Sequence, residues 1–166
     1  MKRGALVMIS VLFSVSISAA WVLAETAEDT VLQKIEAKAD TPFSETQRQK
    51  LIQEIQEAKK EITQAEDGFV KTVTGFLPLP NYEVLNSLSS KNRSAEPEEN
   101  AVVITAALAE KLKRPLSDSE EHKVRGAQKT LKETKENILE NLARSLGGIT
   151  GVSSDDCRKV IDENGI

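Results

Sequence analysis

The sequence predicts an all-α protein, a helical-hairpin bundle of two long helices and about three short ones. Between residues 51 and 65, apolar side chains recur at helical steps of four and three. Ser44 and Ser117 each precede a long segment and stand three residues before a Gln or a Glu, which is the pattern of a capping box. Hydrophobic residues make up 39% of the chain and aromatic residues only 4%, so the core must be aliphatic, as in helix-on-helix contacts.

The first long helix is predicted from about Glu45 to Glu66, or on to Thr74. Ser44 and Gln47 form its capping box, in which the hydroxyl and the amide each satisfy one backbone N–H. Its apolar residues form a narrow seam of the coiled-coil kind, with polar residues at most other positions. This seam is predicted to bind a partner protein or a second copy, and it consists of Leu51, Ile55, Ala58, Ile62 and Ala65.

The segments around this helix are predicted to be shorter. A helix over 26–39 ends before Pro42, because proline disfavours helix in the residue before it. Residues 78–97 form a loop, in which Tyr82, Leu85 and Leu88 are spaced for one or two helical turns. A helix over 97–113 contains the run 102–108, which is expected to be buried on most sides because it is the most hydrophobic segment after residue 24.

The second long helix is predicted over 118–145. Ser117 and Glu120 form its capping box, and the pair Gly147-Gly148 is expected to end it, since glycine commonly follows the last helical residue. A last short helix is predicted over 154–163.

Residues 1–24 are predicted to be a secretory signal peptide. Lys2 and Arg3 give a positive start, and an uncharged apolar stretch follows. This stretch, Gly4 to Ala24, is also long enough to span a bilayer, so an uncleaved membrane anchor is the alternative. Both interpretations place the rest of the chain in the periplasm or outside the cell.

Charge and cysteine content exclude several classes of partner. The net charge is −4, and acidic and basic residues are interspersed with no basic run, so no nucleic-acid partner is predicted. A membrane is a partner only if the N-terminal segment stays uncleaved. Cys157 is the only cysteine, so an intrachain disulfide is impossible; we interpret it as a half-buried structural residue, with an intermolecular bridge or a free reactive thiol as the alternatives.

The domain organisation is predicted as two helical units, 25–77 and 98–166, joined by the loop 78–97. The segments 41–47 and 114–120 align position by position, with Pro and Ser identical and the other residues similar. Both duplication and the convergence of two well-capped helices explain this alignment, because seven residues carry little beyond the capping pattern itself.

These two helix starts resemble the small periplasmic helical stress proteins of the Spy/CpxP group, which carry two Leu-Thr-x-x-Gln motifs. Phe43-Ser44-Glu45-Thr46-Gln47 and Leu116-Ser117-Asp118-Ser119-Glu120 stand at the corresponding places. The resemblance implies a signal peptide, a mostly α structure and a role in the stress response. The chain departs from the group in being acidic and in having only two Met, both within the first eight residues.

No catalytic or metal-binding motif is found, so the chain is predicted not to be an enzyme and to need no cofactor. His122 is the only histidine and sits among charged residues, which is typical of a solvated surface position. With one His and one Cys, an ordinary zinc site cannot be assembled. The acids near the C-terminus do not have the spacing of a calcium loop.

Three functions remain open. The first is a chaperone- or adaptor-like protein that binds other proteins through apolar helix seams, with homodimerisation as the simplest case. The second is a carrier of a small ligand or lipid, with a cavity lined by the segments 102–108 and 69–79. The third is a membrane-anchored helical spacer.

Overall fold

The computed structural model describes residues 27–88 and 97–166, apart from the side chains of Ala27 and of residues 97–101. Within these ranges the chain is all-helical, with six α-helices and no β-strand. The expected signal peptide or anchor and the triplet 92–94, which matches the N-glycosylation pattern, lie outside the described residues.

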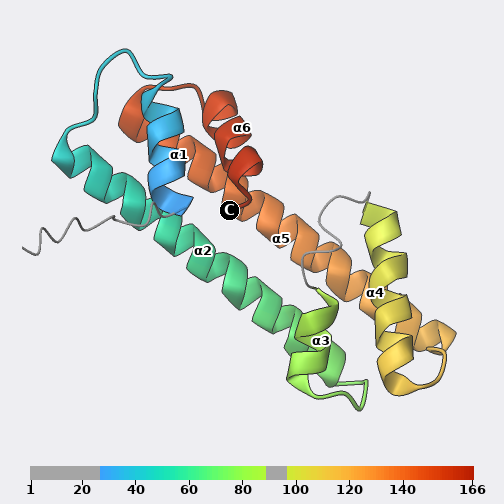
Figure 1. The fold of residues 1–166 in the computed structure, drawn as a ribbon. Coiled ribbons are helices and arrows are strands. Elements are labelled where there is room, and N and C mark those ends of the chain that lie inside the picture. The colour runs from blue at the N-terminus through green and yellow to red at the C-terminus, as the bar shows by residue number, and fades with distance from the viewer. Residues whose placement is uncertain (1–26, 89–96) are drawn as a thin grey trace, which may run out of the picture.

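Two of the helices are long and four are short. The long ones are α2 (Glu45–Thr74) and α5 (Asp118–Thr150), so the first long helix takes the later of its two predicted ends. The short ones are α1 (Ala27–Glu36), α3 (Asn81–Ser87), α4 (Pro97–Leu112) and α6 (Ser154–Asn164). The long helices run side by side in opposite directions, with α1 and α6 over one end and α3 and α4 over the other (Figure 1).

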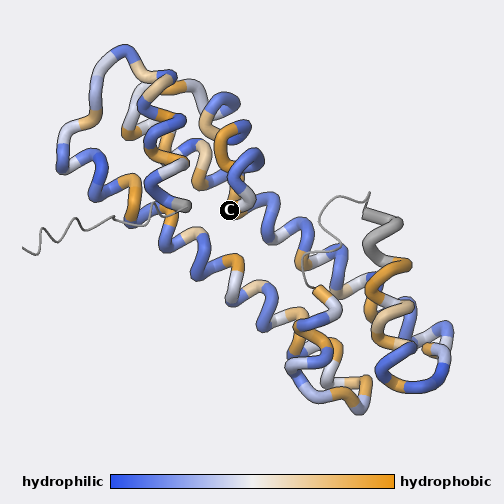
Figure 2. Tube along the Cα trace, viewed as in Figure 1, coloured by the Kyte–Doolittle hydropathy of each residue, from blue (hydrophilic) through white to orange (hydrophobic). Residues whose placement is uncertain are grey.

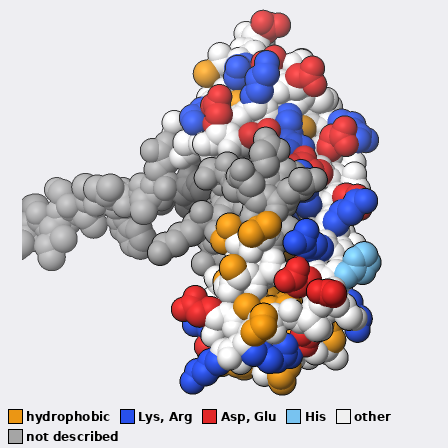
Figure 3. Space-filling view, turned by 90° about the vertical axis from the view of Figure 1, so that its right-hand side faces the viewer, with side chains coloured by type: hydrophobic (Ala, Val, Ile, Leu, Met, Phe, Trp, Pro, Cys, Tyr) orange, Lys and Arg blue, Asp and Glu red, His pale blue; other side chains and the backbone are white. Residues whose placement is uncertain are grey.

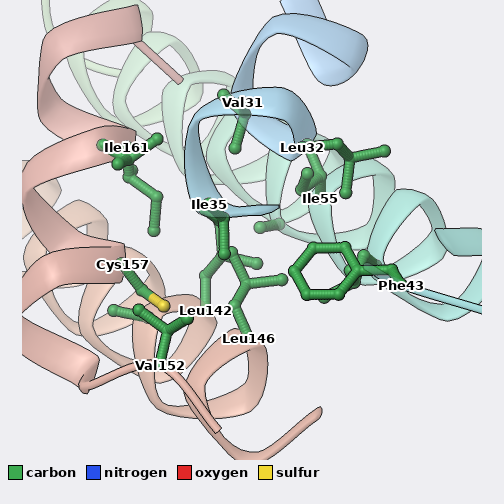
Figure 4. Close-up of a cluster of buried hydrophobic side chains, with 14 residues drawn as sticks. Val31, Leu32, Ile35, Phe43, Ile55, Leu142, Leu146, Val152, Cys157 and Ile161 are labelled. Atoms are coloured by element: carbon green, nitrogen blue, oxygen red, sulfur yellow. The ribbon is translucent and has the colours of Figure 1, made fainter. Parts of the chain in front are cut away.

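Each end encloses its own cluster of buried apolar side chains. The α1/α6 cluster includes the first half of α2 and the last part of α5, and the α3/α4 cluster includes the second half of α2 and the first part of α5. Figure 4 shows the α1/α6 cluster, in which Ile35, Leu142 and Cys157 come from three different helices. Phe43 closes this cluster from the loop before α2.

The two halves of the chain, α1–α3 and α4–α6, correspond position by position. Ser44 and Ser117, the N-caps of the long helices, lie 73 positions apart, and so do Pro80 and Ser153, the N-caps of α3 and α6. Each main helix–helix contact has a counterpart in the other half: α1 with α2 matches α4 with α5, α2 with α3 matches α5 with α6, and α1 with α6 matches α4 with α3. The contact between α2 and α5 is its own counterpart. The following pairs at this spacing are buried in both members: Val31 and Ile104, Ile35 and Leu108, Phe43 and Leu116, Leu51 and Val124, Phe69 and Leu142, Val73 and Leu146, Val84 and Cys157.

This correspondence favours duplication over convergence, because two similar caps do not explain matching burial along six helices. Neither half encloses a core by itself. The α1/α6 cluster joins the first helix of one half to the last helix of the other, and the α3/α4 cluster does the same. The halves therefore pack on each other within one chain.

The end of α5 differs from the prediction. The helix continues through Gly147 and Gly148 and is capped by Gly151 at φ 77°, a left-handed conformation that glycine adopts without strain. A Cβ at position 147 would lie 2.9 Å from the carbonyl oxygen of Val152 and 3.2 Å from Ser154 Oγ. Glycine at 147 therefore allows the start of α6 to approach the backbone of α5.

The predicted loop 78–97 contains the packed helix α3. Val84 and Ser87 are its buried residues, whereas Tyr82 and Leu85 are exposed. The helix thus packs through Val84 and Ser87 and not through the face of Tyr82 and Leu85, which the spacing of the larger apolar residues indicated.

Candidate protein-binding surface

The seam predicted to bind a partner lies inside the folded chain. Leu51 and Ile55 are fully buried and Ala58 nearly so, all in the α1/α6 cluster. Ala65 packs against the α3/α4 cluster, and Ile62 is half-buried. The prediction assumed that the seam was uncovered, but the antiparallel α5 and the short α1 cover it. Leu51, Ile55 and Ala58 are therefore not accessible to a partner in the folded chain.

Both predicted capping boxes are present in the structure. Ser44 Oγ accepts from the Gln47 N–H at 3.3 Å, and Gln47 Oε1 accepts from the Ser44 N–H at 3.0 Å. In the second box, the Ser117 N–H donates to Glu120 Oε2 at 2.8 Å. Arg114 donates two further bonds to Glu120 and, together with that backbone N–H, lowers the pKa of Glu120 to about 2. These residues fix where the long helices begin.

A groove opens between α4 and the start of α5. Its volume is about 230 Å³, and its wall is mostly apolar with one acid and one base at the edge. The groove is lined by Val102, Thr105, Ala106, Ala109, Pro115, Leu116, Glu121 and Arg125. We call this feature the α4–α5 groove.

The corresponding place in the first half is closed by an ion pair. Glu36 of α1 accepts the Phe43 N–H at 2.8 Å and pairs with Arg48 of α2. The Phe43 N–H and then the Arg48 guanidinium hold the pKa of Glu36 below its ordinary value. The Glu36 carboxylate therefore bridges the loop before α2 and α2 itself.

The second half lacks this closure, because Ala109 stands where the first half has Glu36. The Cβ of alanine cannot reach the loop, and the Leu116 N–H, which corresponds to that of Phe43, donates to no atom of the described residues. Glu121 replaces Arg48 and faces Arg125 on its own helix. The α4–α5 groove is thus the open counterpart of a site that the first half fills with its own side chains.

The outer end of the groove is exposed and apolar. Val102 and Ala106, which line the groove, are exposed, Val102 to 56%; Val103, next to Val102 in the chain but outside the lining, is 41% exposed. The expectation that the segment 102–108 is buried on most sides is therefore wrong for its outer face. Figure 2 shows α4 as hydrophobic over most of its described length, and Figure 3 shows hydrophobic side chains gathered on the face where α4 lies.

The same fold does not require valine at these positions. Asp29 and Thr30 occupy the corresponding places in α1, and both are half-buried polar residues. Because a polar pair is compatible with the first half, the exposed valines of α4 are not explained by folding alone. Exposed apolar side chains next to an apolar groove make this surface the candidate interaction site.

His122 and Cys157 lie in opposite environments. His122 is exposed on α5. Cys157 is fully buried rather than half-buried, and this burial raises the pKa of its thiol. Within residues 27–88 and 97–166, no group of three or more His, Cys, Asp or Glu is placed to hold a metal ion.

Comparisons with family models, with curated proteins and with solved structures find no match to this chain. None of the helices that the structure describes has both the length and the apolar character needed to cross a membrane.

The residues of the α4–α5 groove were missed because the helix over 97–113 was interpreted by its hydrophobicity alone. A signal for the groove is present in the sequence. Extending the seven-residue alignment by the same 73-position spacing pairs Glu36 with Ala109 and Asp29 with Val102. These two differences change a polar, closed surface into an apolar, open one.

Proposed function

We propose that this protein is a non-enzymatic, chaperone- or adaptor-like protein of the periplasm or the extracellular space, which binds other proteins through the α4–α5 groove. The observation that supports this most directly is the pair Val102 and Val103, exposed beside an open apolar groove whose counterpart in the same chain is closed and polar. A groove beside an amphipathic helix is a common way of holding an apolar segment of a partner.

A small-ligand carrier has less support. Ligand pockets usually enclose roughly 300–1,000 Å³, whereas the α4–α5 groove measures about 230 Å³ and is partly open to solvent. Residues Phe69, Val70, Val73 and Leu77, which were expected to line a cavity, instead fill the α3/α4 cluster.

We further propose that the fold is a pair of helical hairpins, α1 with α2 and α4 with α5, joined through residues 78–97. The two capped helix starts and the matched burial of the halves support this description. The resemblance to the Spy/CpxP group, and with it export and a role in the stress response, belongs to the same proposal.

The test is the suppression of aggregation of a thermally unfolding reporter enzyme, followed by light scattering. The double variant Val102→Asp/Val103→Thr places the first-half residues on α4, so its fold should be preserved. The exposed parts of the two valines amount to about one side chain, worth roughly 1.5 kcal/mol on burial, so the variant should need about ten times more protein for equal suppression.

The matched control is Leu85→Asn, which removes an exposed apolar side chain of α3 outside the groove. It should suppress aggregation like the wild type. A wild type without any effect on aggregation, or a valine double variant with full activity, contradicts the proposed function.

A further inference from the structure

We infer that two copies of this chain form a weak homodimer in which the two α4–α5 grooves cover each other. This inference rests on the proposed function, because it assigns a partner to the same surface. Val102 and Val103 of each copy would lie against the groove of the other, so that the most exposed apolar side chains of α4 become buried.

The charges at the edge of the groove favour a second copy over a partner of one sign. Glu121 and Arg125 lie one turn apart on α5, with Arg125 Nη2 and Glu121 Oε2 separated by 3.6 Å. The side chain of Glu121 is 43% exposed and that of Arg125 is 55% exposed, so this pair contributes little within one chain and exchanges easily. A two-fold axis places Glu121 against the partner's Arg125 and Arg125 against the partner's Glu121, which forms two pairs at once.

The first half of the chain does not offer the same edge. Arg48 and Ile52 occupy the places of Glu121 and Arg125. Arg48 is already held by Glu36, and Ile52 packs against the α1/α6 cluster. The self-complementary combination of an open groove, exposed valines and one exchangeable ion pair therefore occurs on the α4 side only, among the described residues.

The size of the surface sets the expected strength. Residues 102–112, the part of α4 whose side chains the structure describes, span about 17 Å and are about 10 Å wide, so with an equal strip of α5 they cover roughly 330 Å² per copy. Stable complexes bury about 800 Å² per partner. We therefore expect dissociation in the micromolar range, which leaves monomers with open grooves at lower concentration.

Sedimentation velocity of the purified protein over a range from about 1 to 200 μM, bracketing that micromolar range, tests the inference. The wild type should change from monomer to dimer as concentration rises. Glu121→Arg alone and Arg125→Glu alone should stay monomeric, because each places like charges together twice. An equimolar mixture of the two variants should form a heterodimer, because the Arg side chains of one chain then meet the Glu side chains of the other.

A wild type that is monomeric throughout overturns the inference, and so does a mixture that stays monomeric after both single variants have lost the dimer. Single variants that dimerise like the wild type place any dimer contact elsewhere and also overturn it. Circular dichroism of each variant checks that both charge changes, at exposed sites, leave the helices formed. A monomeric wild type that still suppresses aggregation through Val102 and Val103 refutes the dimer only, and a dimer without suppression refutes the proposed function only.

Discussion

The adjacent glycines of α5 should respond differently to alanine. A Cβ at Gly148 meets no atom within 4 Å, whereas a Cβ at Gly147 meets the Val152 carbonyl oxygen at 2.9 Å and Ser154 Oγ at 3.2 Å. The Ser154 side chain can rotate away. The Val152 carbonyl belongs to the backbone that joins α5 to α6, so Gly147→Ala must displace the start of α6.

The magnitude follows from two opposing terms. Alanine in place of glycine inside a helix contributes about 1 kcal/mol at either position, so Gly148→Ala should raise the free energy of unfolding by up to that amount. Gly147→Ala gains the same term but overpacks a helix whose Cys157, Val160 and Ile161 are buried, which typically costs about 1–3 kcal/mol. The helix term cancels in the comparison, so Gly147→Ala should be about 1–3 kcal/mol less stable than Gly148→Ala.

Urea unfolding followed by circular dichroism measures this difference. The reactivity of Cys157 toward a thiol reagent adds a local probe, since the thiol is fully buried between α6 and the rest of its cluster. Faster labelling is expected in Gly147→Ala and not in Gly148→Ala. Equal stabilities together with equal labelling rates would refute the contact that we assign to Gly147.

Three further changes test other parts of the structure. The Arg114 ion pair lowers the pKa of Glu120 to about 2, so the stability that the ionised Glu120 contributes is present above the ordinary pKa of glutamate and is lost as pH falls through about 2. In urea unfolding, the stability of the wild type relative to Glu120→Gln should therefore fall as pH is lowered from the ordinary glutamate pKa to about 2. A difference that stays constant argues against the ion pair. Gln128→Ile should raise the free energy of unfolding, measured in urea, by about 1–2 kcal/mol. The buried Oε1 of Gln128 has no hydrogen-bond partner among the described residues, and Ile55, at the corresponding place in the first half, is fully buried. A loss of stability would mean that this oxygen is satisfied. Gly126→Ala should stabilise the protein by about 1 kcal/mol and so raise the melting temperature, since a Cβ at this position meets no atom within 4 Å. A lower melting temperature would mean that another group lies close to residue 126.

Helix starts are visible in the sequence because their signals are local. Ser44 and Ser117, each after a proline and each three residues before a Gln or Glu, mark the first residues of α2 and α5 within one turn. The end of α5 is not visible in the same way. Whether the chain leaves the helix at Gly147 depends on how closely Val152 approaches it, and this is a contact of the folded molecule.

The surface of the molecule was harder to predict than its helices. A helix that is apolar on several sides is usually buried, but among the described helices α4 has only α3 and α5 as main neighbours, and no local pattern reports how many helices are available to cover it. The seam of α2 shows the opposite case, because its narrow stripe is covered by α5 of the same chain. Comparing the two halves gives the missing information, since Ala109 differs from Glu36 where the groove opens.

The most direct test of the α4–α5 groove is to close it with the residues of the first half. The double variant Ala109→Glu/Glu121→Arg rebuilds the pair that Glu36 and Arg48 form beside α1. We predict that this variant keeps or raises the melting temperature and loses the suppression of reporter aggregation. A folded variant of this kind that still suppresses aggregation as well as the wild type would contradict the claim that the open groove is the binding surface.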